Sequence, residues 1–522
     1  MSGPGAVVAA AFAARCAERR LDAHPALAVL GHDDGRPAHD PDPARSLGAV
    51  HEQLVVGEAR VSRGAWYTPD WLAADLVARA FPEPGAVADP ACGGGAFLLA
   101  AARRLRAFGV APERIVAELL VGVDIDPLAV AVCEAELWLW SADEGRETLP
   151  GRVTVGDALA GDKLPRVDAV VGNPPFLGQL KTGTAVDAER RRRLAARWGD
   201  AVQAYTDSAG LFLLAAVDAV RPGGRVVMVQ PQSVLAARDT ARVRARVADL
   251  AELEDCWVDD GTAFEASVHV CAPVLRRRDD HVPNPGAELS WVEPILRANG
   301  VPATTATGTA TVADRGTVLA GFRDEYYGLV DHVHEGGDGP RLVTSGSIDP
   351  FRVRTGSVRF AKQRWTCPTV DTASLTGRAC RWTADQHGPK LLVASQTKVV
   401  EAAVDPDGRY LAGVPVIVVR PHDHAELWHL AAALHAPCVS TWMLRRTIGT
   451  GLSAGACRPT AALIAQVPLP DHRDVWDEAA GLAERMAAGE SVAEAFAVSS
   501  DAAYGVDDAE LRSWWLDRVP VP

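Results

Sequence analysis

The chain has 522 residues, of which 48% are hydrophobic and 23% are charged, and its formal net charge is −14. This composition is that of a globular protein, and the length predicts two or three domains with a core each. No stretch reaches the roughly 18 uninterrupted apolar residues that a membrane span needs. An acidic chain is an unusual nucleic-acid binder because phosphate contacts need Lys and Arg, although local arginine clusters can still bind a polyanion.

Cysteine usage and the first residues indicate the compartment. The nine cysteines are scattered without any C-x-x-C pair, and no basic region precedes the Ala-rich segment within the first 20 residues. Zinc sites and disulfide frameworks need clustered cysteines, so we expect reduced thiols and no metal. Since we also find no signal peptide, the sequence predicts a cytoplasmic protein without membrane contact.

Strand-like and helix-like segments alternate from Gly85 to about Val274. The expected strands are Ala86–Ala88, Leu119–Val123, Val153–Val155, Val167–Val171 and Val226–Val229. The expected helices are Ala96–Phe108, Pro127–Ser141 and Leu211–Val220. This alternation predicts an α/β fold, a doubly wound parallel sheet that binds ligands at the carboxyl ends of its strands.

The composition changes around His281–Gly286, where we expect a linker. Short β-like runs at Leu391–Ala394 and Val414–Val419 follow, and helical segments near Val475–Ala488 and Asp507–Asp517 end the chain. We therefore predict a helical lead-in at residues 1–62, an α/β domain at 63–280 and a mixed α+β domain at 287–522.

A glycine-rich loop follows the first expected strand. It reads Asp89-Pro-Ala-Cys-Gly-Gly-Gly-Ala-Phe97 and runs directly into a helix. Glycines let a backbone turn tightly and approach a ligand, and the helix amino terminus offers unpaired N–H groups. The contiguous glycines 93–95 do not fit the G-x-G-x-x-G dinucleotide pattern, which favours a nucleoside ligand without a pyrophosphate.

Acidic residues follow the next two strands. Asp124 stands at the tip of the second strand, where its carboxylate can accept hydrogen bonds from both hydroxyls of a ribose. We interpret Asp126 mainly as a helix cap, because Pro127 then opens the helix. Asp157 ends the third strand and can accept a hydrogen bond from an adenine amino group; its alternative is a turn residue. The three strand ends together suit an adenosine.

The fourth strand leads into Asn173-Pro174-Pro175-Phe176. The prolines restrict the backbone, so the carbonyl groups before them have a fixed direction. A carbonyl there and the Asn173 side-chain oxygen can accept both hydrogens of an exocyclic amine, whose lone pair then points at a methyl donor. Such catalysis depends on positioning and electrostatics. Phe176 offers a flat face on which a base can stack.

These motifs resemble the N-6 DNA methylase family of restriction-modification systems, in its gamma class. Upstream, Leu47-Gly-Ala-Val-His-Glu-Gln-Leu54 and Tyr67-Thr68-Pro69 are similar to the family's leading segment and tenth motif, and Asp207 and Phe212 fall at its fifth. Two residues depart from the pattern, His51 and Phe176 where Tyr is more usual, and neither suggests an inactive enzyme. The resemblance is strong over residues 45–275 and thin afterwards.

The resemblance implies a Rossmann-like class I S-adenosylmethionine-dependent methyltransferase domain followed by a mixed α+β target-recognition domain. It implies that S-adenosylmethionine is bound by Tyr67, Thr68 and Pro69 at its methionine part, by Asp89, Ala91 and Gly93 in the loop, and by Asp124, Ile125, Asp157, Ala158 and Asn173 elsewhere. The catalytic residues would be Asn173, Pro174, Pro175 and Phe176. The reaction would methylate N6 of adenine.

A base amine inside a duplex is inaccessible, so we expect a flipped-out adenine between Phe176 and Phe264. Double-stranded DNA and further subunits of a restriction or phage-defence system would be the partners. The expected contacts to the DNA backbone come from the arginine clusters, with Arg191, Arg192, Arg445, Arg446 and Arg458 as candidates.

Other methyl acceptors remain open. Cytosine-5 methylation is disfavoured, because it needs a Pro-Cys pair after the fourth strand and the chain has its Pro437-Cys438 pair in the second domain. The N4 amine of cytosine suits the same acceptors as adenine. A glutamine side chain of a protein does too, but enzymes of that class lack a large carboxyl-terminal domain.

Overall fold

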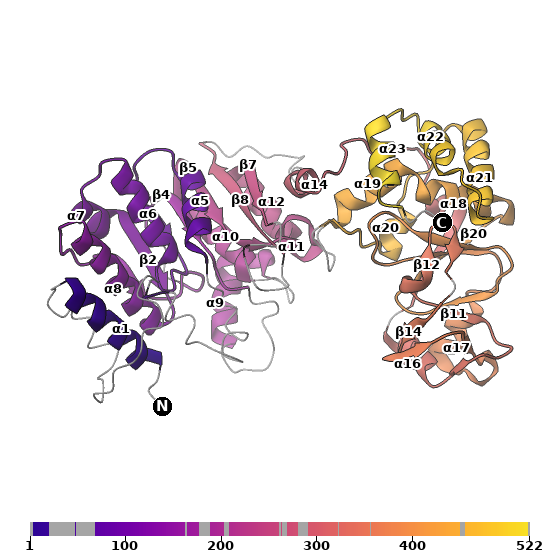
Figure 1. Cartoon of the computed structure of the whole chain (residues 1–522), viewed down its shortest axis with the longest axis horizontal. Coiled ribbons are helices and arrows are strands. Elements are labelled where there is room, and N and C mark those ends of the chain that lie inside the picture. Colours follow the sequence, from indigo (N-terminus) through magenta and orange to yellow (C-terminus); the bar gives the residue numbers. More distant parts are fainter. Residues whose placement is uncertain are drawn as a thin grey trace. The chain divides into compact units, whose positions relative to one another are not determined.

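The computed structural model describes residues 4–19, 47–48, 68–161, 164–176, 188–202, 208–259, 263, 269–279, 291–321, 323–354, 356–448 and 455–519. The chain forms two compact units, Met1–Pro294 and Ile295–Pro522 (Figure 1). The expected linker around residues 281–286 lies outside the described residues. Within these ranges, no helix is long and apolar enough to cross a membrane.

The first unit alternates strands and helices. Its strands are β1 (Val87–Asp89), β2 (Leu120–Asp124), β3 (Val153–Val155), β4 (Val167–Gly172), β5 (Val220–Met228), β6 (Gln230–Pro231), β7 (Ala251–Val258) and β8 (Val270–Arg277). Its helices are α1 (Pro4–Arg19), α5 (Asp70–Ala80), α6 (Ala96–Ala107), α7 (Pro112–Arg114), η1 (Ile115–Leu119), α8 (Pro127–Asp143), α9 (Ala188–Trp198), η2 (Gly199–Ala201), α10 (Ser208–Ala219), α11 (Ser233–Ala236), η3 (Arg238–Thr240), α12 (Ala241–Leu250) and α14 (Glu293–Ala298), the last of which crosses into the second unit.

The strands form one eight-stranded sheet in the order β3-β2-β1-β4-β5-β8-β6, with β7 also paired to β8. Strands β1 to β5 are parallel, whereas β8 runs antiparallel to β5 and β7. The chain order reverses at β1, which lies between β2 and β4. The carboxyl ends of β1, β2 and β4 therefore meet at the switch point, where doubly wound sheets bind ligands. The predicted α/β architecture is confirmed.

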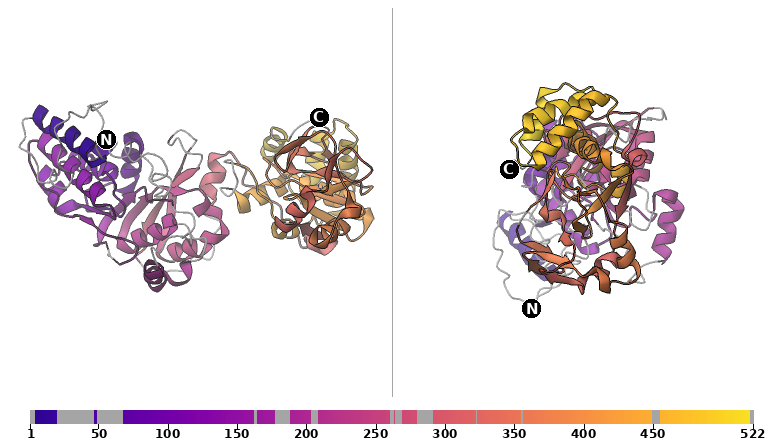
Figure 2. Two further views of the ribbon diagram at one scale, coloured as in Figure 1. Left: turned by 90° about the horizontal axis from the view of Figure 1, so that it is seen from below. Right: turned by 90° about the vertical axis from the view of Figure 1, so that its right-hand side faces the viewer.

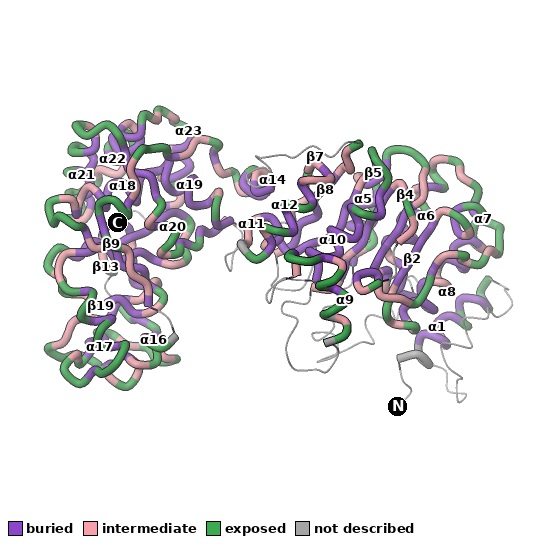
Figure 3. The backbone as a smooth tube through the Cα atoms, turned by 180° about the vertical axis from the view of Figure 1, so that it is seen from behind, coloured by how far each residue is buried: buried purple, intermediate pink, exposed green. Residues whose placement is uncertain are grey.

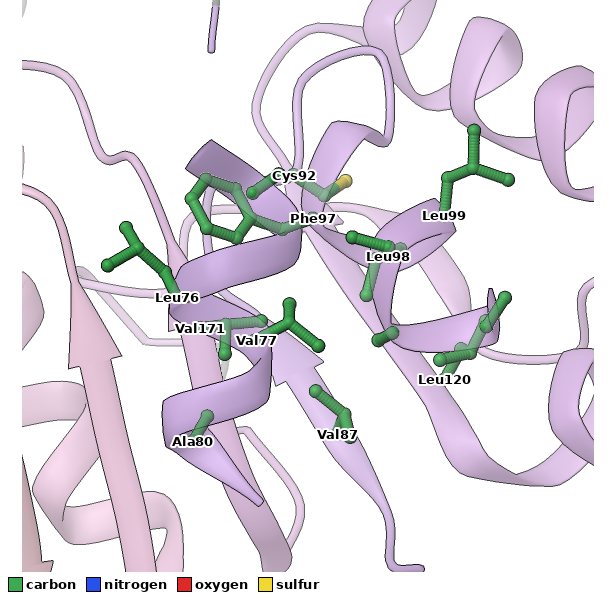
Figure 4. Packing of buried hydrophobic residues seen from close by; sticks show 14 of the residues in the cluster. Leu76, Val77, Ala80, Val87, Cys92, Phe97, Leu98, Leu99, Leu120 and Val171 are labelled. Carbon is green, nitrogen blue, oxygen red and sulfur yellow. The ribbon is translucent and has the colours of Figure 1, made fainter. Parts of the chain in front are cut away.

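Helices cover both faces of this sheet (Figures 1 and 2). On one face, Val77 of α5 and Val171 of β4 belong to one buried cluster that also includes side chains of α6 and α8 (Figure 4). Val170 and Val226, which alternate with the members of that cluster, are equally buried where α10 packs on β4 and β5. Burial on both faces explains why these strands are continuous apolar runs, drawn as buried in Figure 3.

Helix α1 adds a smaller core to the first unit. Val8 and Phe12 are fully buried, and the Phe12 ring meets the ring of Trp138 on α8 edge-on, with centroids 6.0 Å apart. The expected helical lead-in therefore packs on the outside of α8 in its described part, although the boundary at residues 62/63 stays a prediction.

The second unit is mixed α and β. Its strands are β9 (Gly316–Ala320), β10 (Val333–Glu335), β11 (Arg341–Val343), β12 (Ile348–Asp349), β13 (Arg352–Val353), β14 (Val358–Phe360), β15 (Gln363–Trp365), β16 (Pro368–Val370), β17 (Lys390–Val393), β18 (Ala402–Asp405), β19 (Tyr410–Ala412) and β20 (Ile417–Pro421). Its helices are α15 (Val312–Arg315), α16 (Arg323–Val330), η4 (Ser345–Ser347), η5 (Thr372–Ser374), α17 (Gly377–Ala384), η6 (His424–Glu426), α18 (Leu427–His435), α19 (Pro437–Thr447), α20 (Ala461–Ala465), α21 (Arg473–Ala487), α22 (Ala493–Ala503) and α23 (Ala509–Leu516).

Small sheets replace the single large sheet in this unit. Two four-stranded sheets have the orders β10-β16-β11-β19 and β18-β17-β20-β9, and β12-β13 and β14-β15 are two-stranded. A buried cluster that includes Leu342, Leu392 and Val418 joins both larger sheets. The unit thus has a core of its own.

Candidate active site

The glycine-rich loop after β1 is shaped by close packing. Gly93 and Gly95 have φ angles of 51° and 91°, which side-chain-bearing residues rarely adopt. A Cβ on Gly95 would lie 2.9 Å from the Cys133 sulfur on α8, and one on Gly94 would lie 2.4 Å from the Cα of Gly48. The leading segment and the loop, which the sequence separates by about forty residues, therefore touch through two glycines.

Asp124 ties this loop to the tip of β2. Its carboxylate accepts the N–H of Gly93 at one oxygen and the N–H of Asp126 at the other, both at 2.9 Å. Ile125, beside it, exposes 67% of its surface although it is large and apolar. A carboxylate and an apolar side chain thus stand together at one strand end. The predicted capping role of Asp126 is confirmed, since its Oδ1 accepts the N–H of Leu128 at the start of α8.

Asp89, at the end of β1, is buried with 1% of its surface exposed. Burial raises its pKa to about 8, against the opposing effect of the Ala91 N–H, which donates to Oδ1 at 3.0 Å; the nearby Asp124 carboxylate adds to the rise. Gly172 lies so close that a Cβ on it would come within 2.6 Å of Asp89 Oδ1. The side chain is therefore packed between β1 and β4.

Asp157 is engaged by a helix that the sequence did not predict. Arg190 of α9 donates from Nε to Asp157 Oδ2 at 2.7 Å, and Oδ1 accepts the N–H groups of Leu159 and Ala160. Burial opposes ionisation, but the Arg190 ion pair and these N–H groups outweigh it, so the pKa of Asp157 lies below its usual value. The carboxylate is thus ionised. Its bonds to the N–H groups of Leu159 and Ala160 also make Asp157 a turn residue, which is the alternative role that the sequence allowed.

Two hydroxyl groups hold the Asn-Pro-Pro segment. The Asn173 amide nitrogen donates to Oγ1 of Thr68 at 3.1 Å, and Thr68 is itself buried at the residue that precedes Pro69 and α5. Ser208, the first residue of α10, donates from Oγ to the carbonyl oxygen of Pro175 at 2.7 Å. Because Asn173 uses its nitrogen for Thr68, its side-chain oxygen is directed away from this contact.

The remaining candidates are placed unevenly. Phe176 is half-buried and packs against the large apolar cluster, while Ala158 and Phe212 are buried. Tyr67, Asp207 and Phe264 lie outside the described residues. The structure therefore brings Thr68, Asn173 and the strand-end carboxylates to one edge of the sheet, and the predicted stacking pair of Phe176 and Phe264 stays a prediction.

Most of the predicted DNA-contacting arginines already have partners inside the chain. Arg192 is paired with Glu189 at 2.9 Å, and Arg445 donates to the carbonyl oxygens of Pro302 and Ala303. Arg446 lies 3.8 Å over the Trp442 ring, and burial, followed by the proximity of Arg445, lowers its pKa. Arg458 is exposed, and the side chain of Arg191 lies outside the described residues. Their role at DNA stays a prediction.

Sequence reasoning missed three contacts at the site. The sequence did not predict the ion pair of Arg190 with Asp157, and the bond of Thr68 to Asn173 joins residues 105 positions apart. Ser208 carried no signal, since a single serine at a helix start is commonly a cap. The E-R-R-R-R run at 189–193 indicates a basic segment, but it does not indicate which carboxylate one of its arginines contacts.

Comparison with known proteins now identifies the domain that carries this site. The model of the N-6 DNA methylase family matches residues 44–277, which hold the glycine-rich loop, the strand-end acids and the Asn-Pro-Pro segment. Residues 44–277 belong to the N-6 DNA methylase family. The strand order of this N-6 DNA methylase domain, with one antiparallel strand beside β5, is that of class I S-adenosylmethionine-dependent methyltransferases.

Relatives of the N-6 DNA methylase domain include two type I restriction enzyme methylase subunits. That of StySPI from Salmonella potsdam is 27% identical over 210 residues, and that of MjaIX from Methanocaldococcus jannaschii is 32% identical over 115 residues. The matches cover 36% and 22% of this chain and 36% and 19% of those proteins. The matches thus span little more than a third of the first relative and less than a fifth of the second.

A likeness over both units comes from a solved structure, the type IIL restriction-modification enzyme MmeI in complex with DNA. The TM-score is 0.56 at 13% sequence identity, and the match covers 91% of this chain and 82% of that chain. At this identity the likeness concerns the fold alone. It extends beyond the N-6 DNA methylase domain into the second unit.

Proposed function

We propose that this protein transfers a methyl group from S-adenosylmethionine to the N6 amine of a flipped-out adenine in double-stranded DNA. The observation that carries the proposal is the position of Asn173: its side chain follows β4, next to the strand-end acids, and its amide nitrogen donates to Thr68 Oγ1 at 3.1 Å. Membership of the catalytic segment in the N-6 DNA methylase family supports adenine as the substrate.

The strand ends fit the cofactor. Asp124 is fixed by two N–H groups and can still accept ribose hydroxyls, because each carboxylate oxygen accepts more than one hydrogen bond. The exposed side chain of Ile125 offers an apolar surface to the adenine ring, and the ionised Asp157 an acceptor to its amine. S-adenosylmethionine supplies an electrophilic methyl group when bound.

The chain's own residues would activate the amine by positioning. Asn173 Oδ1 and the carbonyl oxygen of Pro174 accept the two amine hydrogens and favour a tetrahedral nitrogen, which is otherwise flattened by conjugation with the ring. Thr68, two residues before α5, bonds the Asn173 amide, and Ser208 at the start of α10 bonds the carbonyl oxygen of the neighbouring Pro175, so both fix the segment that carries these acceptors. Preorganised acceptors of this kind lower the barrier because nothing has to reorient during the reaction.

The second unit would recognise the DNA site, and other subunits of a restriction or phage-defence system would be further partners. Two observations support this: the matched relatives are methylase subunits of type I restriction enzymes, and the fold likeness to a DNA-bound restriction-modification enzyme extends through the second unit. Within the described residues, no group of His, Cys, Asp or Glu could hold a metal ion.

Asn173→Ala tests the assignment. We expect methyl transfer to duplex DNA to fall by at least about 1000-fold, since a central transition-state acceptor is lost, while S-adenosylmethionine binding measured by calorimetry changes less than about threefold. Asn299→Ala is the matched control, because Asn299 lies in the second unit and its amide nitrogen donates to the nearby carbonyl oxygen of Ile295. Full activity of the Asn173 variant would remove the proposal.

A further inference from the structure

The second unit contains a small β-hairpin with an unusual distribution of charge. Strands β14 and β15 pair antiparallel through Val358 and Trp365, and the residues between them in the register are Arg359 and Arg364, directly opposite one another. The two-residue turn consists of Ala361 and Lys362. Three of the eight residues from Val358 to Trp365 are therefore cations.

One face of the hairpin is anchored in the core. Val358 and Phe360 are 3% and 4% exposed, and the Phe360 ring lies 5.0 Å from the Tyr326 ring of α16, centroid to centroid. The Trp365 indole N–H donates to the Phe360 carbonyl at 3.2 Å. Because side chains alternate along a strand, Arg359 and Arg364 emerge from the opposite face, and both are exposed.

This arrangement has two local costs. Like charges directly opposite in an antiparallel pair repel each other. In addition, Ala361 and Lys362 both have left-handed backbones, with φ of 49° and 64°, where a two-residue hairpin turn favours Asn and Gly. The hairpin therefore keeps three cations where its own stability would favour other residues.

Among the described residues, no carboxylate offsets this cost. Within the part of the chain that the structure describes, none of the three cations has an ion-pair partner. Glu335, which lies next to the strand end, accepts the N–H groups of Thr366 and Cys367 instead. Three other exposed arginines of the same unit are paired and serve as a comparison: Arg378 with Asp324, Arg409 with Asp407 and Arg485 with Glu490.

We propose that the β14–β15 hairpin is a DNA-binding element that contacts phosphates of duplex DNA through Arg359, Lys362 and Arg364. The inference rests on the proposed function for the identity of the polyanion. A two-stranded ribbon fits the major groove, and phosphates attract cations that lack an internal partner. In a chain with a net charge of −14, such a cluster gives the local attraction that the overall charge does not.

The test compares two triple variants of the full chain. The first replaces the hairpin cations, R359Q/K362Q/R364Q. The control removes the same charge from paired positions in the same unit, R378Q/R409Q/R485Q. Binding to a fluorescent duplex of about 30 base pairs is measured by anisotropy across a series of salt concentrations, and methyl transfer to the same DNA is measured separately.

We expect the hairpin variant to bind DNA at least about tenfold more weakly and to lower the slope of log affinity against log salt by about two to three, one per lost phosphate contact. Its melting temperature should be unchanged or higher, because the opposed charges are gone. The control should stay within about threefold of the parent.

Three outcomes would overturn the hairpin assignment: an unchanged hairpin variant, equal losses in both variants, or a parent chain that does not bind duplex DNA. The proposed function is judged on a different signal. If the parent chain transfers methyl groups to DNA and the hairpin variant binds normally, the inference fails and the function stands. If neither transfers a methyl group, the function itself fails.

Discussion

Two roles are assigned to Thr68. The family resemblance implies that it contacts the cofactor, and the structure shows that its hydroxyl accepts a hydrogen bond from Asn173. Thr68→Val removes the acceptor and keeps the shape. If the hydroxyl orients the Asn173 amide, we expect kcat at saturating cofactor to fall about tenfold, the size of one positioning hydrogen bond. Thr68→Ser, which keeps the hydroxyl, should recover most of that loss.

Steady-state kinetics separates the two roles of Thr68. A residue that only binds the cofactor would raise the KM for S-adenosylmethionine and leave the saturated rate unchanged. That pattern for Thr68→Val would contradict the orienting role while leaving Asn173 as the catalytic residue.

Asp89 makes stability depend on pH. Its pKa is raised to about 8 in the folded protein, against an ordinary value near 4 in the unfolded chain, so between these values the folded state holds one more proton. Stability must therefore fall as pH rises from about 4 to 8. Asp89→Asn removes this dependence and keeps the oxygen that accepts the Ala91 N–H.

The expected gain for Asp89→Asn at pH 8 is on the order of 3 kcal/mol in the free energy of unfolding, measured by urea titration. At pH 4.5 the difference should be small. Curves of stability against pH that run parallel for the two proteins would show that Asp89 is ionised throughout this range.

At the level of elements, the glycine-rich loop requires glycine for two reasons: the backbone conformation and the lack of space for a side chain. Gly95 has a left-handed backbone and no room for a Cβ beside Cys133, whereas Gly145, after α8, has a similar φ of 83° and open space around it. Gly145→Ala should cost about 1 kcal/mol for the backbone alone. Gly95→Ala should cost about 2 kcal/mol more, because the helix α8 must shift.

Thermal or urea unfolding of the two alanine variants gives the comparison, with cofactor affinity as a second measurement. Only the Gly95 variant is expected to bind the cofactor more weakly. Equal destabilisation by both substitutions would mean that packing against Cys133 contributes nothing.

The parallel strands β1, β2 and β4 were predictable from the sequence because they are buried on both faces. The more exposed β3 was predictable because it consists of β-branched residues. Val167–Val171 was expected as a strand and β4 covers Val167–Gly172, while Val153–Val155 is found as predicted. The fifth strand was placed too late, at Val226, because β5 begins at Val220 and passes through Arg221-Pro-Gly-Gly224, which has the sequence of a turn and is exposed in its first three residues. Helix α9 was not predicted because its run of arginines leaves few apolar residues, so the helical spacing of apolar residues is not visible in the sequence.

The site was predictable to the extent that it lies in local motifs. Asp124, Asp157 and Asn173 follow strands, and a parallel sheet brings strand ends together whatever the rest of the fold does. The contacts of Thr68 with Asn173 and of Arg190 with Asp157 depend on tertiary packing, so no pattern in one sequence contains them. The hairpin was missed for a related reason: its charge is meaningful only once Arg359 is seen opposite Arg364.

For the whole molecule, two separate cores predict two unfolding events. The first unit is held by the cluster around the sheet, and the second by the cluster that joins its small sheets. Each core could support a domain by itself. In differential scanning calorimetry we expect two transitions, of which S-adenosylmethionine raises only the one that belongs to the first unit, because a ligand stabilises what it binds. A single transition that shifts as a whole would contradict this.

Because most of the cysteines are buried, a dye can be attached at a few defined positions and used to measure DNA binding. Of nine free thiols, Cys367 and Cys380 are exposed, and both belong to the second unit. Cys367 follows Trp365 by two residues, immediately beyond the cationic hairpin. A maleimide dye should therefore attach at Cys367 and Cys380 in the unaltered chain, and Cys380→Ser would confine it to the hairpin's edge. The arrival of a duplex could then be followed in real time as a change in the dye's emission.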